Sequence, residues 1–297
     1  MTLKLGIIGL SEGNGHPYSW SAIFNGYDPV AMRDCDFPVI PRYLEKQNWP
    51  QDSIALAKVT HIWTQDTEMS VKVAKAALIR EIVSNPEEMI GQVDAILLAR
   101  DDAENHYYFA RPFIEAGLPI YIDKPICHSL DMLDDIYKIE KYEGQIFTCS
   151  ALRYASEFVL SDEVRIKLGK LIHIQATTPK DWDKYAVHVI EPLLMLAGDQ
   201  GELIRRQCWS EGGATVVNLV WETGFGATIS AMGKVSCPLG LRLIGENGWH
   251  DMHFENTFAA FKGALSDFVQ GVINRDNRIP REFVRRVVEV IETGKVI

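Results

Sequence analysis

The sequence lacks the features that mark membrane spans, nucleic-acid binding and disulfide-bonded folds. Its uninterrupted apolar runs, such as 95–99, are far too short to cross a bilayer, and its first residues show no charged region followed by an apolar stretch, as a signal peptide would. The 40 acidic residues outnumber the 30 basic ones, whereas nucleic-acid binding needs clustered Lys and Arg. The five cysteines are scattered without a C-x-x-C pair, which disfavours a metal site. We therefore expect a cytoplasmic protein whose partner is a small molecule.

The first half of the chain alternates between strand-like and helix-like segments. A chain of 297 residues is long for one compact core, so two domains are expected. Strands that alternate with helices at short spacing indicate a parallel, doubly wound sheet. The predicted strands are 3–9, 58–64, 79–83, 93–99 and 119–122, and the predicted helices are 18–25, 70–78, 85–90 behind Ser84, and 105–116. We expect a Rossmann-type dinucleotide-binding domain over 1–124.

The second half changes from alternation to consecutive strands. A helix is predicted at 185–197. The strand candidates that follow are 203–209, 214–221, 226–232 and 241–244, and two amphipathic helices are predicted near the end. Consecutive strands with short turns favour a mainly antiparallel sheet with helices on one face. We expect 125–297 to form an α+β domain that binds substrate and forms oligomer contacts.

The segment 27–57 stands apart from this pattern. It carries four prolines and reads as irregular, but it also holds many aromatic and aliphatic residues, Trp49 among them. Loops this long inside compact domains are commonly functional. We expect this insertion to be ordered and to cover part of the active-site cleft.

The turn after the first strand is where a Rossmann fold binds pyrophosphate through backbone N–H groups. It reads Gly9-Leu-Ser-Glu-Gly-Asn-Gly-His-Pro17. Ser11 replaces the second glycine of G-x-G-x-x-G, Gly13 stands out of place, and Glu12 adds a negative charge. Two interpretations stay open, a dinucleotide-binding turn with Gly9, Ser11 and Gly13 at the cofactor, or a turn that only joins strand to helix.

The end of the second strand predicts the contact to the adenosine ribose. A neutral Thr64 or, two residues later, Asp66 must serve there. Neither has an Arg immediately beside it, and Asp66 with Glu68 would repel a 2′-phosphate. NAD is therefore favoured over NADP, which is not excluded.

The strongest signal is a set of motifs with a characteristic order and spacing. They are Val93-Asp-Ala-Ile-Leu-Leu-Ala, then Asn105-His106, then Ala116-Gly-Leu-Pro-Ile-Tyr-Ile-Asp-Lys-Pro125. The chain resembles the glucose–fructose oxidoreductase / inositol dehydrogenase / MocA family, whose members carry a similar strand, a downstream His and a strand that ends in E-K-P. Here the tripeptide is Asp123-Lys124-Pro125. This part of the match covers 58–127.

The resemblance continues in the second half with some departures. Arg153-Tyr154 follows a strand, as an Arg–aromatic pair does in the family. Lys184-Tyr-Ala-Val-His188-Val-Ile-Glu191 stands where the family has D-x-G-x-H-x-x-D, with Lys184 in place of the first Asp. Leu241–Gly248 resembles the family's hydrophobic-x-G-x-x-G turn.

The resemblance implies hydride transfer between a nicotinamide and a sugar, sugar nucleotide or related hydroxy or carbonyl compound. Such chemistry needs a proton acceptor at the reacting oxygen. We predict that His188 transfers the proton while Lys124 orients the oxygen, although the two roles could be exchanged. The remaining implied contacts are His106, Asp123 and Lys124 for the cofactor, and Arg153, Lys184 and Tyr18 for the substrate. The family also implies a homo-oligomer, either a dimer or a tetramer.

A second class of function fits the same fold. A non-catalytic or regulatory relative could keep the architecture and bind a small ligand, because fold does not determine function. The irregular glycine turn and the missing Asp before His188 favour this alternative, whereas Lys124 and His188 together favour the enzyme. The sequence does not specify the substrate or the direction of the reaction.

Overall fold

The computed structural model describes residues 2–295, so the first residue and the last two of the expected domains lie outside the described part. The chain forms two compact units. The first comprises residues up to Ile126 with Asp134–Thr148 and Phe261–Pro280, and the second comprises Cys127–Leu133, Cys149–Ala260 and residues from Arg281 onward. Two segments downstream of residue 124 therefore pack in the first unit.

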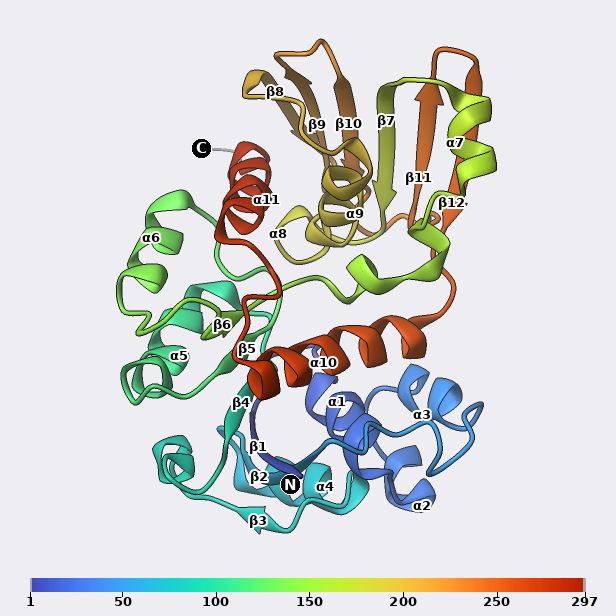
Figure 1. Ribbon diagram of the computed structural model, residues 1–297. Helices are drawn as coiled ribbons and strands as arrows, with labels where there is room; N and C mark the ends of the chain where they lie inside the picture. Colours follow the sequence, from blue (N-terminus) through green and yellow to red (C-terminus); the bar gives the residue numbers. More distant parts are fainter. Residues whose placement is uncertain (1, 296–297) are drawn as a thin grey trace. The chain divides into compact units, whose positions relative to one another are not determined.

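The first unit is built on a six-stranded sheet. Its strands are β1 (Leu3–Ile8), β2 (Ala57–Trp63), β3 (Glu81–Ile82), β4 (Ala95–Leu98), β5 (Ile120–Ile122) and β6 (Ile146–Phe147). They lie in the order β3-β2-β1-β4-β5-β6, and all pairings are parallel (Figure 1). This is the strand order of a Rossmann fold, so the predicted fold class of the first half is confirmed.

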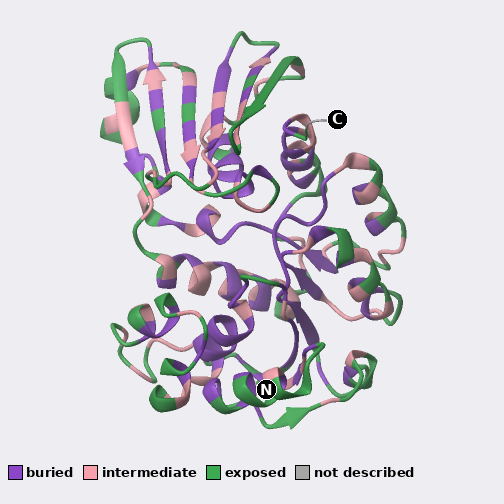
Figure 2. Cartoon of the chain, turned by 180° about the vertical axis from the view of Figure 1, so that it is seen from behind, coloured by how far each residue is buried: buried purple, intermediate pink, exposed green. Residues whose placement is uncertain are grey.

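The register of this sheet brings three chain segments to one edge. Ile8 pairs with Leu98, and Leu98 pairs with Ile122. The three strands are almost wholly buried, as expected for a parallel sheet covered on both faces (Figure 2). The residues that follow them leave the sheet side by side at its carboxyl edge, where open α/β folds bind ligands.

Helices of the first unit follow the predicted alternation with shifted ends. They are α1 (His16–Asn25), α4 (Thr67–Ala76), the 3₁₀ helices at Pro86–Met89 and Ala103–Asn105, α5 (His106–Glu115), the end of α6 (Leu130–Lys138) and most of α10 (Thr257–Asn274). The prediction of Ser84 as the N-cap is wrong. Asn85 caps this helix, and Glu88 completes a capping box with it. Ser84 instead donates a hydrogen bond to Glu88.

The segment 27–57 is ordered as predicted, but it is not irregular throughout. It contains α2 (Pro29–Arg33) and α3 (Val39–Leu44). Asp28 caps α2 and Pro29 occupies its first turn, where a missing N–H costs nothing. Pro29 begins α2 and Pro38 directly precedes α3, whereas Pro41 lies within α3 and Pro50 in a turn. Ile40 and Leu44 of α3 are buried.

The second unit contains a mainly antiparallel sheet, as predicted. Its strands are β7 (Leu171–Thr178), β8 (Leu203–Glu211), β9 (Ala214–Trp221), β10 (Gly226–Ala231), β11 (Gly240–Gly245) and β12 (Gly248–His253). They lie in the order β12-β11-β7-β10-β9-β8, with one parallel pair, β7 with β10. Two strands of this sheet are not predicted from the sequence: β7, which joins the two halves of the sheet, and β12.

Helices cover one face of this second sheet. They are α7 (Asp162–Leu168), α8 (Trp182–Tyr185), α9 (Val187–Ala197) and α11 (Arg281–Thr293), with 3₁₀ turns at Ala151–Tyr154 and Ser156–Phe158. The predicted helix at 185–197 is thus α9 preceded by a short separate helix. Its inward residues pack with Val217 and Ile229 in one apolar core.

Candidate active site

The glycine turn after β1 leads directly into α1. A Cβ on Gly9 would collide with the ring of Pro17, and Gly13 has a φ of +77°, a conformation that favours glycine. A Cβ on Gly15 would lie 2.7 Å from both Phe37 and Ile40. The turn is therefore packed against the 27–57 segment as well as against α1.

The turn offers backbone donors in spite of its unusual sequence. Within the described chain, the N–H groups of Ser11, Glu12 and Gly13 donate to no protein acceptor. The Ser11 hydroxyl instead donates to Asp101 Oδ1 at 2.6 Å and accepts from the Asp101 N–H at 3.0 Å. Three successive N–H groups at the carboxyl edge suit an anion such as a pyrophosphate. These residues fit a dinucleotide.

Two side chains that the sequence analysis missed brace the turn. Gln65 accepts a hydrogen bond from the Leu10 N–H at 2.9 Å and donates one to the Leu10 carbonyl. Arg100 donates to the Gln65 Oε1 at 3.1 Å and is held by a bidentate pair with Asp102. Their signal in the sequence was only their position, directly after β2 and β4.

The two residues predicted to contact the ribose form hydrogen bonds with their neighbours in the sequence. The Thr64 hydroxyl donates to the Asp66 carbonyl at 2.6 Å and is bonded to the Ser70 hydroxyl. Asp66 caps α4 by accepting from the Glu68 N–H, and its side chain is exposed. Thr64 is buried and its hydroxyl is already hydrogen-bonded. Asp66 is therefore better placed than Thr64 to contact a ribose.

His106 is buried and bridges two loops of the carboxyl edge. Its Nδ1 lies 2.9 Å from the Ile126 carbonyl oxygen, and its Nε2 lies 2.8 Å from that of Arg100. Both ring nitrogens are thus engaged by the backbone. The structure gives this histidine a role in holding the loops after β4 and β5, and a contact of its ring with the cofactor stays a prediction.

Asp123 and Lys124 follow β5 and are both buried. Asp123 Oδ1 accepts from the Lys124 N–H at 2.8 Å, and its Oδ2 accepts from Asn14 Nδ2 at 3.0 Å and contacts His16 Nδ1 at 2.6 Å. Lys124 Nζ lies 3.7 Å from Asp101 Oδ2. The lysine amine is therefore linked through Asp101 to the same turn that offers the free N–H groups.

In the second unit, His188 lies in the first turn of α9. Its Nδ1 is 2.8 Å from the Ser150 hydroxyl, and its ring packs edge-on against Tyr185. Ser150 is fully buried, and its N–H donates to Glu191 Oε1 at 2.6 Å. Ser150 thus holds the two polar residues of the H-x-x-E motif at once. The sequence analysis did not single it out.

Glu191 is buried with an incomplete set of hydrogen bonds. Within the described residues its Oε2 has no partner. Burial raises the pKa of Glu191 to about 8, and the Ser150 N–H and the Arg153 charge oppose this rise only partly. The side chain is therefore mainly protonated at neutral pH.

Glu191→Gln is expected to weaken a pH dependence of stability. Because the pKa of Glu191 is raised in the fold, the folded protein keeps a proton that the unfolded chain loses above its ordinary pKa of 4.5. The free energy of unfolding then falls as pH rises between these two values, by up to about 1.4 kcal/mol per pH unit. The thermal unfolding midpoint of the wild type should fall from about pH 5.5 to about pH 8, and that of the variant should fall less.

The exposed Glu211 at the end of β8 provides the control for this measurement. Glu211→Gln should keep the pH slope of the wild type. Equal slopes in the wild type and in Glu191→Gln would show that the carboxyl group is ionised throughout this range.

The three predicted substrate contacts differ in their placement. Arg153 stacks its guanidinium on Phe283 at 4.5 Å and has a buried Nη1 without a hydrogen-bond partner within the described chain. Lys184 is half-buried in α8. Tyr18 is 2% exposed, its hydroxyl contacts Met69 Sδ, and burial raises its pKa to about 12. This apolar placement argues against Tyr18 as a substrate contact.

The predicted residues therefore fall into two groups. The glycine turn, Asp123 and Lys124 are linked by hydrogen bonds in the first unit, and His188 and Arg153 lie around Ser150 in the second. A joint site of Lys124 and His188 stays a prediction.

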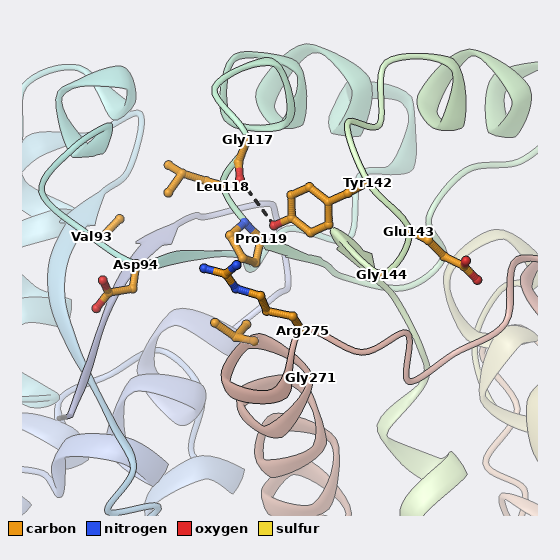
Figure 3. Close-up of a pocket in the computed structure, with 11 residues that line it drawn as sticks. Val93, Asp94, Gly117, Leu118, Pro119, Tyr142, Glu143, Gly144, Gly271 and Arg275 are labelled. Atoms are coloured by element: carbon orange, nitrogen blue, oxygen red, sulfur yellow. Dashed lines mark hydrogen bonds between the residues drawn. The ribbon is translucent and has the colours of Figure 1, made fainter.

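A cavity of about 740 Å³ lies elsewhere in the first unit. It is lined by Asp94 and Pro119, which precede β4 and β5, and by Tyr142 and Arg275 (Figure 3). Tyr142 donates to the Gly117 carbonyl at 3.3 Å. This cavity is at the amino edge of the sheet, and its lining includes none of the predicted site residues.

Over residues 2–295, no cluster of three or more His, Cys, Asp or Glu side chains is arranged to hold a metal ion. Within the same residues, no helix combines the length and apolar character needed to cross a bilayer.

Comparison with known sequences gives one family match. The model of an oxidoreductase family with an NAD-binding Rossmann fold, the glucose–fructose oxidoreductase / inositol dehydrogenase / MocA family, matches residues 39–150. Over these residues the chain is similar to the family that its motifs predict. The match confirms the predicted family, the oxidoreductase class and NAD as the cofactor of that class. No curated protein matches the sequence.

Solved structures share the fold over nearly the whole chain. Myo-inositol 2-dehydrogenase from Lactobacillus plantarum has a TM-score of 0.74 and 15% identity, with 98% of this chain and 96% of that chain covered. Scyllo-inositol dehydrogenase from Lactobacillus casei, solved with NAD(H) and scyllo-inositol, has a TM-score of 0.72 and 13% identity over 98% and 95%. UDP-N-acetylglucosamine 3-dehydrogenase from Acidithiobacillus ferrooxidans has a TM-score of 0.70 and 13% identity over 98% and 96%.

Proposed function

We propose that this chain is a member of the matched family and an NAD-dependent oxidoreductase that acts on a CH–OH group of a sugar, sugar nucleotide or related polyol. The observation that carries the proposal is the turn with free N–H groups at Ser11, Glu12 and Gly13, joined through Asp101 to the buried Lys124. The related structures named for action on inositols and on a UDP-sugar support a polyhydroxylated substrate.

In this proposal each residue has a defined task. The three N–H groups hold the pyrophosphate, and Asp66 contacts the adenosine ribose. The bound NAD⁺ supplies the hydride acceptor. Lys124 and His188 face the reacting oxygen, where one orients it and the other handles its proton. Arg153, with a donor left free inside the second unit, and Lys184 bind the remaining polar groups of the substrate.

Thermal unfolding with nicotinamide cofactors tests the proposal. A ligand at about 100 times its dissociation constant adds roughly 2.7 kcal/mol to the stability of the protein. NAD⁺ or NADH should therefore raise the unfolding midpoint, and NADPH should raise it less because Asp66 and Glu68 repel its 2′-phosphate. If no nicotinamide form at millimolar concentration changes the midpoint, the chain is the non-catalytic relative instead.

We further propose that the outer face of the second sheet forms the oligomer contact. Val217 and Ile229 point into the core and are fully buried, whereas Trp209 and Trp249 on the opposite face are 55% and 64% exposed. Two exposed tryptophans on one sheet face favour a protein partner. Light scattering should give the mass of a dimer or tetramer, and Trp209→Glu with Trp249→Glu should lower that mass. A wild-type monomer would contradict this assignment.

A further inference from the structure

Lys180 lies in the short connection between β7 and α8 and has an unusual backbone conformation. Its φ is +63°, in the left-handed region that residues other than glycine seldom adopt. Two backbone hydrogen bonds with Gly233, one in each direction and each 2.8 Å long, hold this conformation. Residues that their surroundings keep in this region cluster at active sites and ligand-binding sites. The backbone from which the Lys180 side chain extends is therefore fixed.

The ammonium group of Lys180 is connected to the histidine of the proposed site through Tyr185. It lies over the Tyr185 ring, 4.1 Å from the ring centre, and donates a hydrogen bond to the Tyr185 hydroxyl. His188 packs edge-on against the same ring, with the two ring centres 5.2 Å apart. All three residues belong to the second unit. A ligand of the size of a substituted sugar that contacts His188 can therefore also contact Lys180.

Over the described part of the chain, no acidic residue neutralises the ammonium group of Lys180. Asp181 and Asp183 are close in the sequence and exposed, but neither forms an ion pair with it within residues 2–295. Asp181 instead caps α8 by accepting from the Lys184 N–H at 2.8 Å. Lys180 is exposed, and an ammonium group has three donors, of which Tyr185 uses one. Donors therefore remain for an anion from solvent.

The second unit places further cations near His188, although the chain as a whole carries a formal net charge of −10. Lys184 stands where the resembling family has an aspartate, so a positive charge replaces a negative one. Arg153 lies close enough to Glu191 to lower its pKa, but burial dominates and raises that pKa to about 8. Glu191 is therefore mainly neutral and does not balance the cations. Such an excess of positive charge favours a substrate that carries a negative charge.

We propose that Lys180 binds an anionic group of the substrate, either a carboxylate or a phosphate, next to His188. The inference rests on the proposed function and narrows its substrate class to acidic sugar derivatives, such as sugar acids and sugar phosphates. An ammonium group suits both anions because it acts as a point charge, whereas the guanidinium of Arg153 can add directional hydrogen bonds.

The first test measures ligand binding to the NADH-loaded protein by calorimetry. The probes are galacturonate, glucose 6-phosphate and the neutral sugar galactose. At least one anionic probe should bind the wild type about tenfold more tightly than galactose, the effect of one charged hydrogen bond, and Lys180→Met should lose this preference. Lys180→Arg should keep it because the positive charge remains. Lys167→Met, which removes an exposed lysine of α7 in the same unit, should also keep it.

The second test is the salt dependence of the same affinities. Salt screens interactions between exposed charges, so the preference of the wild type for the anion should shrink as NaCl rises from about 50 mM to about 500 mM. The affinity for galactose should stay constant. A preference for the anion that does not change with salt would contradict a contact between opposite charges.

A purely structural role of Lys180 predicts a different result, because loss of its contact with Tyr185 would weaken the binding of all three probes alike. That result would overturn the inference, and so would an absence of anion binding or anion affinities of Lys180→Met equal to those of the wild type. If NADH binds but the charge preference is absent, the inference fails while the proposed function stands. If NADH does not bind, the proposed function fails and the inference falls with it.

Discussion

Lys124→Met is expected to reduce NAD-linked turnover almost to background while NAD⁺ affinity stays within a few-fold. The amine of Lys124 is buried 3.7 Å from Asp101 and lies at the edge where the substrate oxygen is expected. Methionine keeps much of the volume of the lysine side chain and removes its positive charge. A charge interaction or hydrogen bond that the transition state needs is therefore lost. Steady-state kinetics with calorimetric NAD⁺ titration separates these two effects.

Lys58→Met is the matched control for this variant. Lys58 is also in the first unit and donates from Nζ to the Phe24 carbonyl, but it has no place in the proposed site. Circular dichroism should show that both variants fold. Turnover by Lys124→Met at the rate of the control would show that the family chemistry has been wrongly assigned to this chain.

His188→Asn is expected to lower kcat by about 10²- to 10⁴-fold, the effect of losing a positioned acid, base or hydrogen-bond donor. The asparagine side chain is polar but shorter than the imidazole. It therefore cannot bond Ser150 at one end and the substrate at the other, as we propose for His188. If His188 donates a hydrogen bond, the pH optimum should stay unchanged while the rate falls. If it is the base, the limb of the pH profile at low pH should disappear.

His253, an exposed histidine at the end of β12, provides the control in the same unit. His253→Asn should keep the activity of the wild type. Full activity of His188→Asn would remove this residue from the site, wherever a structure of the complex places its side chain.

The fold of the first unit could be predicted because local patterns and the final topology agree. The buried strands β1, β4 and β5 are short apolar segments, and helices of ordinary amphipathic pattern separate them. The α2 and α3 helices were missed because their prolines were interpreted as loop residues. Capping by Asp28 and the burial of Ile40, which depend on tertiary packing, decide their structure.

The second unit shows where local patterns are insufficient. The strand β7 alternates buried and accessible residues only in its later part, and its place between β11 and β10 follows from pairing with distant strands. The return of 261–280 to the first unit likewise depends on contacts such as that of Phe268 with Tyr121. No local pattern specifies such contacts.

Only part of the candidate site could be predicted from the sequence, because local patterns do not specify contacts between distant segments. Lys124 and His188 belong to motifs with characteristic neighbours, so the sequence singled them out. Gln65 and Ser150 act through hydrogen bonds to residues 55 and 38 positions away. His16 likewise contacts Asp123, which is 107 positions distant. Such roles become visible only when the strands bring the segments together.

The most direct test of the central claim is a crystal structure of the protein with NAD⁺. Density for the pyrophosphate is expected at the N–H groups of Ser11, Glu12 and Gly13. Lys124 and His188 are expected within reach of one substrate oxygen beside the nicotinamide ring. A dinucleotide bound elsewhere, or the two side chains on opposite faces of the ring, would contradict it.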